Sequence, residues 1–132
     1  MKTIKAIFEQ GEWLTAEQLN ALQPNPSTQK SQPASEWKRL GRIFAVSHGG
    51  QEYFASYQFD EAYQPLPIIE EVLKAFGEVS DNWKIAAWFH YPNGWLSKLG
   101  TQGRAPLAPK DALDQRAALL RAATARRGSY EA

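Results

Sequence analysis

The sequence predicts a mainly α fold of the α+β class that contains one β-hairpin. The first supporting observation is the segment Asn82–Tyr91, which is apolar on nearly every side and therefore predicts a buried helix. The second is the segment 65–77, in which hydrophobic residues recur at helical spacing between two prolines and a glycine. The third is a pair of β-prone segments, 42–46 and 51–57, whose connection contains two glycines. The chain has 132 residues, of which 43% are hydrophobic and none is cysteine, so it can build a core without disulfides.

Three short helices are expected before the hairpin. Residues 3–10 have one apolar face at helical spacing. Residues 15–22 begin with a capping box, in which the side chains of Thr15 and Gln18 satisfy free backbone groups. A polar stretch with three prolines predicts a loop, and residues 35–40 then predict a third helix that a glycine closes. The residues expected to point into the core from these helices are Ile4, Ile7, Phe8, Leu19, Leu22, Trp37 and Leu40.

The hairpin and the helix after it are bounded by glycines and prolines. The segment Ser47–Gly50 forms the hairpin turn, because glycine adopts positive φ without strain. Pro65 and Pro67 flank the start of the next helix, and Gly77 ends it. The apolar stripe of that helix is expected to contain Ile68, Ile69, Val72, Leu73 and Phe76.

Turns and loops separate the central helix from the last one. A serine or aspartate immediately before the central helix is expected to cap it, and Pro92 to end it, after which Asn93-Gly94 predicts a turn. Residues 97–105 predict a loop, and the last helix is expected over 111–126. The residues assigned to the core-facing side of that helix are Leu113, Ala117, Leu120 and Thr124.

The net charge of +1 conceals an uneven distribution of charge. Residues 30–51 carry four basic residues against one acidic residue, and residues 104–127 carry six against two. Between them, residues 52–81 carry seven acidic residues against one basic residue. This pattern indicates either separate surfaces for separate partners or ordinary solvated faces.

The sequence holds no recognisable constellation for catalysis, metal binding or cofactor binding. Its only two histidines are His48 and His90, and it has no nucleophile elbow, no Gly-x-Gly-x-x-Gly and no Walker A motif. We therefore expect no catalytic residue, no metal, no cofactor, and a protein that is not an enzyme. The first residues lack the long apolar run of a signal peptide, and no stretch is long enough to span a membrane, so a cytoplasmic location is expected.

In the N-terminal half, Leu14-Thr15-Ala16-Glu17-Gln18-Leu19 is followed by a polar stretch and then by Trp37-Lys38-Arg39-Leu40-Gly41-Arg42. This pattern resembles the excisionase and MerR-like winged helix-turn-helix, in which a tryptophan near the end of the reading helix precedes a basic residue, a glycine and the wing. The resemblance implies a winged-helix-like unit over residues 1–60 that binds DNA. The other interpretation is a winged-helix-like scaffold that does not read DNA. The DNA contacts that the resemblance implies are Ser27, Thr28, Lys30, Lys38, Arg39, Arg42 and, at the wing tip, His48.

The C-terminal half holds an ordered set of residues, which are Trp88, Pro92, Asn93, Leu96, Gly103, Pro106 and Ala112-Leu113. In this order they resemble the toxin-binding domain of the Xre–MbcA–ParS antitoxin family. In that family a helix with a tryptophan ends in Pro-Asn, a leucine follows, and a Gly-x-x-Pro step opens the last helix. The resemblance covers a little over half of the chain and implies a helical unit over residues 61–127. It also implies a partner toxin, commonly a RES-domain enzyme that consumes NAD, whose active site the antitoxin blocks while often repressing its own operon.

Such blocking requires an exposed element that can enter the active site of the toxin, and the basic C-terminal segment fits this requirement. Arginine can bind a carboxylate or a phosphate through two parallel hydrogen bonds. The other interpretation is an amphipathic helix with a solvated outer face. Residues 128–132 are expected to form a flexible tail. The residues expected to bind the partner are Arg116, Arg121, Arg126, Arg127 and Tyr130.

The first predicted function is therefore that of an antitoxin-like, non-enzymatic protein that binds and neutralises a partner toxin, with binding of operator DNA as a further expectation. Two alternatives stay open: a DNA-binding transcriptional regulator without a toxin, and a protein–protein adaptor. The expected partners are a toxin, double-stranded DNA and a second copy of the chain, and no membrane.

Overall fold

The computed structural model describes residues 2–97 and 106–131, and for Lys2, Thr3, Trp95, Ser97 and residues 126–131 it describes the backbone alone. It confirms a mainly helical α+β fold with a small antiparallel sheet. The helices are α1 (Lys2–Gln10), α2 (Ala16–Ala21), α3 (Ala34–Arg39), α4 (Pro67–Phe76), α5 (Asn82–His90) and α6 (Arg116–Glu131). The strands are β1 (Trp13–Leu14), β2 (Val46–His48), β3 (Gln51–Ala55), β4 (Asn93–Ser97) and β5 (Pro106–Leu107), with 3-10 helices η1 (Ser56–Gln58) and η2 (Pro109–Asp111).

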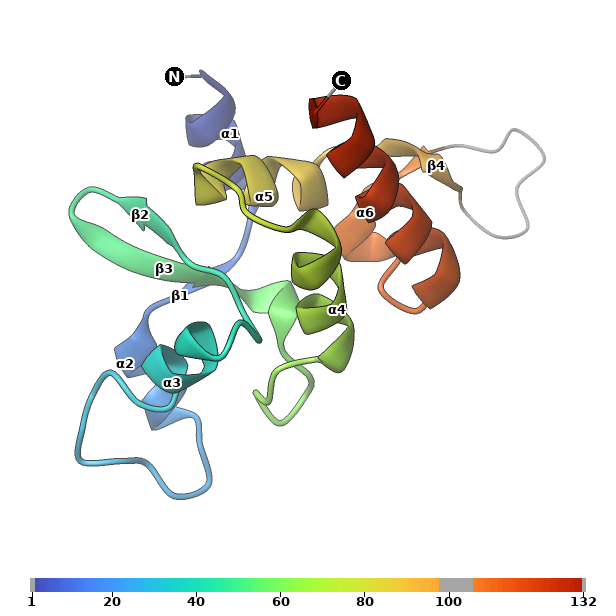
Figure 1. Cartoon of the computed structure of the whole chain (residues 1–132). Helices are drawn as coiled ribbons and strands as arrows, with labels where there is room; N and C mark the ends of the chain where they lie inside the picture. Colours follow the sequence, from blue (N-terminus) through green and yellow to red (C-terminus); the bar gives the residue numbers. More distant parts are fainter. Residues whose placement is uncertain (1, 98–105, 132) are drawn as a thin grey trace.

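The three-stranded sheet has β3 in its middle, because β1 and β2 both pair with β3 in antiparallel orientation. Gly49 and Gly50 connect β2 to β3 with φ values of 58° and 80°, as a two-residue hairpin connection requires. The predicted hairpin is therefore confirmed, although β2 begins only at Val46. Figure 1 shows this hairpin on one side of the molecule and α4 with α6 on the other.

The order of elements in the N-terminal half is helix, strand, two helices and hairpin, from α1 through β3. The sequence predicts three helices and then a hairpin, so β1, which gives the strand order β1-β3-β2, was not expected. The winged-helix-like unit over residues 1–60 stays a prediction. The main neighbour of α1 is α5 of the C-terminal half. The first helix therefore packs with the central helix, while α2 and α3 pack with each other and α2 also contacts β3.

Capping residues set the helix boundaries that the sequence predicts. Thr15 accepts a hydrogen bond from the backbone N–H of Gln18 at 3.1 Å, and the Gln18 side chain accepts one from the backbone N–H of Thr15 at 2.8 Å. Asp81 caps α5 by accepting from the backbone N–H of Trp83 at 3.0 Å. These bonds satisfy N–H groups that the first helical turn leaves free.

The core consists of two hydrophobic clusters. The smaller cluster contains Leu19, Ala34, Trp37, Ile43, Ala45, Phe54 and Phe59. The larger cluster contains Ile7, Phe44, Val46, Ala55, Ile69, Val72, Phe76, Ile85, Ala86, Phe89, Leu96, Ala112, Leu119, Ala122 and Ala123. The larger cluster takes residues from both sides of the unit boundary expected at residue 60, and that boundary stays a prediction.

Two leucines predicted for the core are exposed. Leu22 is 43% exposed and Leu40 is 50% exposed. The reason is that α2 ends at Ala21 and α3 at Arg39, so each leucine is a capping residue beyond the apolar face of its helix. The predictions for Leu22 and Leu40 are therefore wrong.

The segment between α5 and α6 also differs from the prediction. Asn93-Gly94 begins strand β4, which pairs with β5, where a turn was expected. The last helix begins at Arg116 and not at residue 111, because β5 and η2 occupy the residues before it. The loop expected at 97–105 lies outside the described residues, apart from Ser97 at the end of β4.

The buried side of the C-terminal segment is only in part the predicted one. Leu113 and Leu120, both expected to face the core, are half-buried and pack against the larger cluster. The predictions for Ala117 and Thr124 are wrong, because both are exposed, and Leu119, Ala122 and Ala123 are buried instead. Alanines occur on several sides of α6, so the spacing of its apolar residues is compatible with more than one buried side. The backbone stays helical through Glu131, where a flexible tail was expected from residue 128.

Candidate functional site

The arginines predicted to bind a partner lie on α6, and the first of them is engaged within the molecule. The Nε atom of Arg116 lies 2.9 Å and 3.1 Å from the two carboxylate oxygens of Glu71 on α4, and its Nη2 bonds to one of the same oxygens. This hydrogen bonding lowers the pKa of the Glu71 carboxyl and raises the pKa of Arg116. Arg116 therefore ties the first turn of α6 to α4.

The remaining candidates lie further along the same helix. Arg121 is exposed and has no ion-pair partner in the part of the chain that the structure describes. Arg126, Arg127 and Tyr130 belong to the last turns of α6, and their side chains lie outside the described part. Figure 1 places α6 between α4 and β4, and α6 contacts both. The outer side of α6 is the side that these neighbours leave exposed, and it carries Arg121.

The basic residues predicted to contact DNA are mostly paired with glutamates. Their closest nitrogen–oxygen distances are 3.9 Å for Lys30 and Glu17, 2.7 Å for Lys38 and Glu52, and 2.5 Å for Arg39 and Glu36. Arg42 is half-buried and forms no ion pair with the side chains that the structure describes. Among these side chains, no carboxylate therefore offsets the charge of Arg42.

Ser27 and Thr28 lie in the exposed loop between α2 and α3. The side-chain amide of Asn20 holds this loop: its Nδ2 donates to the Ser27 carbonyl at 2.7 Å, and its Oδ1 accepts from the Ser27 backbone N–H at 2.7 Å. Asn20 is only 7% exposed, so the loop is fixed to α2 at this point. The two hydroxyl residues therefore lie beside α2 and outside any reading helix.

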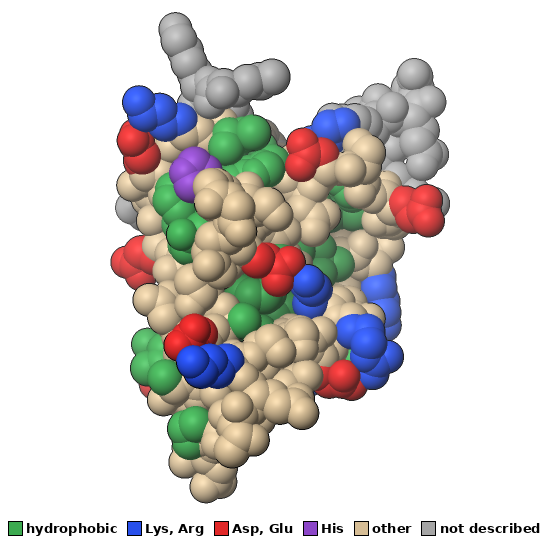
Figure 2. All heavy atoms as spheres, turned by 90° about the vertical axis from the view of Figure 1, so that its left-hand side faces the viewer, with side chains coloured by type: hydrophobic (Ala, Val, Ile, Leu, Met, Phe, Trp, Pro, Cys, Tyr) green, Lys and Arg blue, Asp and Glu red, His purple; other side chains and the backbone are tan. Residues whose placement is uncertain are grey.

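His48 belongs to an aromatic surface that also contains Phe8, Trp13, Tyr53 and Trp83. The His48 ring stacks on Phe8 with 4.1 Å between the centroids, and Trp83 lies 5.8 Å from Trp13. The indole N–H of Trp83 donates to the Ser47 carbonyl at 2.9 Å, which joins α5 to β2. These rings come from five elements, α1, β1, β2, β3 and α5, so no local sequence pattern indicated them. Figure 2 shows the face on which the hairpin lies, where a histidine is surrounded by hydrophobic side chains.

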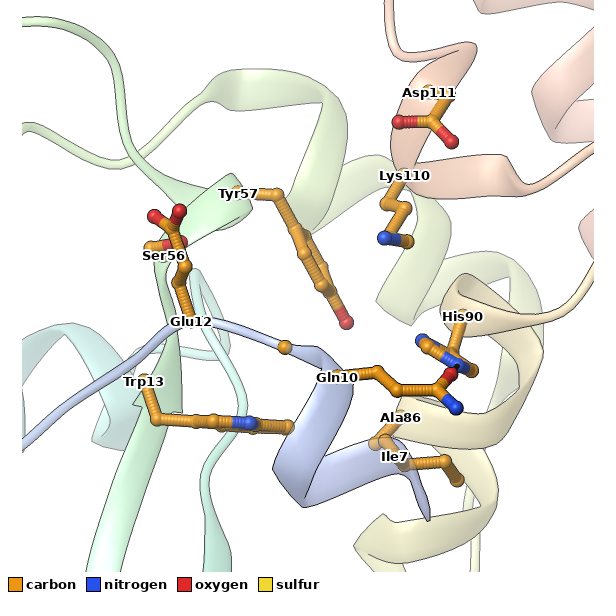
Figure 3. Close-up of a pocket in the computed structure, with 11 residues that line it drawn as sticks. Ile7, Gln10, Glu12, Trp13, Ser56, Tyr57, Ala86, His90, Lys110 and Asp111 are labelled. Carbon is orange, nitrogen blue, oxygen red and sulfur yellow. Dashed lines mark hydrogen bonds between the residues drawn. The ribbon is translucent and has the colours of Figure 1, made fainter. Parts of the chain in front are cut away.

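A pocket of about 200 Å³ opens between the end of α1, η1, α5 and η2 (Figure 3). Trp13, Ile7 and Ala86 supply apolar walls. Its polar lining residues are Gln10, Glu12, Ser56, Tyr57, His90, Lys110 and Asp111. Because these residues span more than 100 positions of the chain, sequence reasoning had no means of grouping them.

Tyr57 and His90 are the pocket residues whose electrostatics are most altered. The hydroxyl of Tyr57 is buried with no hydrogen-bond partner among the described residues, and burial raises its pKa. A buried polar group without a partner costs about 1–3 kcal/mol. Burial, and then the charge of Lys110, lowers the pKa of His90, while Asp111 acts in the opposite direction. His90 Nε2 lies 2.8 Å from Gln10 Oε1, so an uncharged imidazole donates to Gln10 from Nε2 and leaves Nδ1 free to accept.

No protein family, curated protein or solved structure matches the chain. Within the described residues, no group of three or more histidine or acidic side chains is placed to hold a metal ion. None of the helices in the described ranges has the length and apolar character needed to cross a bilayer.

Proposed function

We propose that the protein is an antitoxin-like, non-enzymatic binding protein that neutralises a partner toxin through the outer side and C-terminal turns of α6. The observation that carries this proposal is the fixation of α6 on α4. The Arg116–Glu71 pair holds its first turn, and Leu119 with Ala122 buries its inner side. A helix held in this way loses little conformational freedom on binding, so its outer side is preorganised for a partner.

The charge on the outer side of α6 indicates the chemistry of the partner surface. Arg121 is exposed and unpaired among the described side chains, so it can bind a carboxylate or a phosphate through two hydrogen bonds. The order of residues shared with the toxin-binding domain of the Xre–MbcA–ParS antitoxins supports a toxic enzyme as that partner. A cytoplasmic site of action belongs to the same proposal.

Arg121→Glu is expected to weaken binding of the partner at least tenfold, because it reverses a charge at the contact. The partner is isolated from nuclease-treated lysate with tagged protein as bait. The bait is expected to retain a small protein in stoichiometric amount, and expression of that small protein alone is expected to stop growth. Affinity is then measured by isothermal titration calorimetry. Lys74→Glu, an exposed change on α4, is the matched control and is expected to leave affinity unchanged. Absence of such a partner, or equal affinity of both variants, would contradict the proposal.

Binding of double-stranded DNA is a second candidate function, which the sheet order β1-β3-β2 and the unpaired charge of Arg42 favour. The ion pairs of Lys38 and Arg39 with glutamates oppose it, since each carboxylate competes with phosphate for the same cation. Arg42 is therefore expected to contribute more to DNA affinity than Lys38.

Arg42→Ala is expected to lower DNA affinity about tenfold and to reduce the slope of log affinity against log salt by about 1, because one phosphate contact is lost. Lys38→Ala is expected to have a smaller effect, and Glu52→Gln to raise affinity by freeing Lys38. Titrations of duplex DNA at graded salt measure all three variants. If none of them changes affinity or the salt slope, this face does not bind DNA.

A further inference from the structure

The pocket is used by neither proposed binding activity, and its polar groups form two separate sets. Lys110 and the hydroxyl of Tyr57 lie at the end formed by α5 and η2 (Figure 3). Glu12 and Ser56 lie at the opposite end, on the far side of the Tyr57 ring (Figure 3). The two ends therefore differ in the kind of group that they can bind.

The end at Lys110 offers two hydrogen-bond donors, beside the exposed carboxylate of Asp111. The Tyr57 hydroxyl is buried and unpartnered in the described part of the chain, and Lys110 supplies an ammonium group. At the neighbouring His90, burial and then the charge of Lys110 lower the pKa, while the charge of Asp111 acts in the opposite direction. An anionic oxygen placed here would accept from both Lys110 and Tyr57.

The end at Glu12 offers acceptors. Glu12 is exposed and forms no ion pair among the described residues, and the hydroxyl of Ser56 lies beside it (Figure 3). The Tyr57 ring lies between the two ends, with the Trp13 indole below Glu12 (Figure 3). A cationic group at Glu12 would thus be joined to an anionic group at Lys110 through an apolar middle.

We propose that this pocket binds a small zwitterion of amino-acid size, with its carboxylate at Lys110 and Tyr57 and its ammonium group at Glu12. A zwitterion would engage both sets of polar groups, whereas a simple anion would use only Lys110 and Tyr57 and a simple cation only Glu12 and Ser56. The volume of about 200 Å³ is below the range of about 300–1,000 Å³ that drug-sized ligands occupy and fits a small ligand. The proposal depends on neither the toxin nor DNA.

A series of unbranched amino acids, from glycine to 6-aminohexanoate, tests the two-ended site by isothermal titration calorimetry on the full chain. Affinity is expected to pass through a maximum at one chain length, because both charged ends must be reached together. Hexanoate and hexylamine, each with one charged group, are expected to bind at least tenfold more weakly than the best amino acid. No saturable binding of any member, or equal affinity for hexanoate, would overturn the proposal.

Three variants then assign the ends. Lys110→Met and Glu12→Gln are each expected to lower affinity for the best amino acid at least tenfold, and Lys74→Met on α4 to leave it unchanged. Tyr57→Phe is expected to weaken binding while keeping or raising the melting temperature, since the hydroxyl has no partner to lose within the described residues. A folded Tyr57→Phe or Lys110→Met protein with unchanged affinity would show that the carboxylate is bound elsewhere and would overturn the assignment.

Discussion

Replacing Phe89 with alanine is expected to lower the free energy of unfolding by about 3–5 kcal/mol. Phe89 is fully buried in the larger cluster, and its ring lies 5.8 Å from Phe44, 5.1 Å from Tyr57 and 5.0 Å from Trp88. Truncation removes the whole ring and leaves a cavity that three aromatic neighbours of fixed shape cannot fill. Urea denaturation followed by circular dichroism measures the loss.

The control for this prediction is Leu40→Ala. Leu40 is 50% exposed, so its truncation is expected to change the free energy of unfolding by no more than about 0.5 kcal/mol. If Phe89→Ala cost as little as this control, Phe89 would not lie in a close-packed core.

Replacing Gln58 with leucine is expected to cost about 2–4 kcal/mol, although leucine has a similar size and is more apolar. Gln58 is fully buried, and its amide bonds both backbone groups of Phe44: Oε1 accepts from the N–H at 2.8 Å and Nε2 donates to the carbonyl at 3.0 Å. Leucine leaves these two groups buried without partners, which outweighs the gain from a more apolar side chain. The free energy of unfolding from urea titration measures the effect.

The variant Gln58→Glu distinguishes a loss of stability caused by missing hydrogen bonds from one caused by poor packing. A carboxylate can accept from the Phe44 N–H but cannot donate to the Phe44 carbonyl, whereas a protonated carboxyl can do both. The pKa of this glutamate is therefore raised in the folded state above about 4.3, its ordinary value. The stabilisation by the protonated carboxyl is present below that value and is lost as pH rises through the folded pKa. The loss of free energy of unfolding caused by Gln58→Glu is therefore expected to be smaller at pH 4 than at pH 7. A deficit independent of pH would contradict the role of Gln58.

Elements fixed by neighbouring residues could be predicted from the sequence. The capping box of Thr15 and Gln18, the two glycines of the hairpin and the apolar stripe of α4 depend on residues a few positions apart. Strand β1 was missed because its two residues carry no alternation, and its pairing depends on β3 about 40 residues later. The role of Gln58 was missed for the same reason, since its partner Phe44 lies 14 residues away.

The candidate sites could be predicted only where charge is visible in the sequence. The basic character of α6 was recognised, but not the pairing of Arg116 with Glu71, which lies 45 residues earlier on another helix. His48 was expected at a wing tip from the winged-helix resemblance, and its stacking on Phe8 depends on how α1 packs. The pocket was not predicted at all, because Gln10 and His90 are 80 residues apart.

Successive residues of the sheet region contribute to different hydrophobic clusters. Phe54 belongs to the smaller cluster and Ala55 to the larger one, and residues 43–46 alternate between the two in the same way. Unfolding of one cluster therefore displaces backbone segments whose neighbouring side chains are buried in the other cluster. The two halves of the chain are expected to unfold in a single cooperative transition. Backbone amides of β3 should accordingly exchange with deuterium only through global unfolding. A ligand bound to either half of the chain should therefore slow amide exchange in both halves.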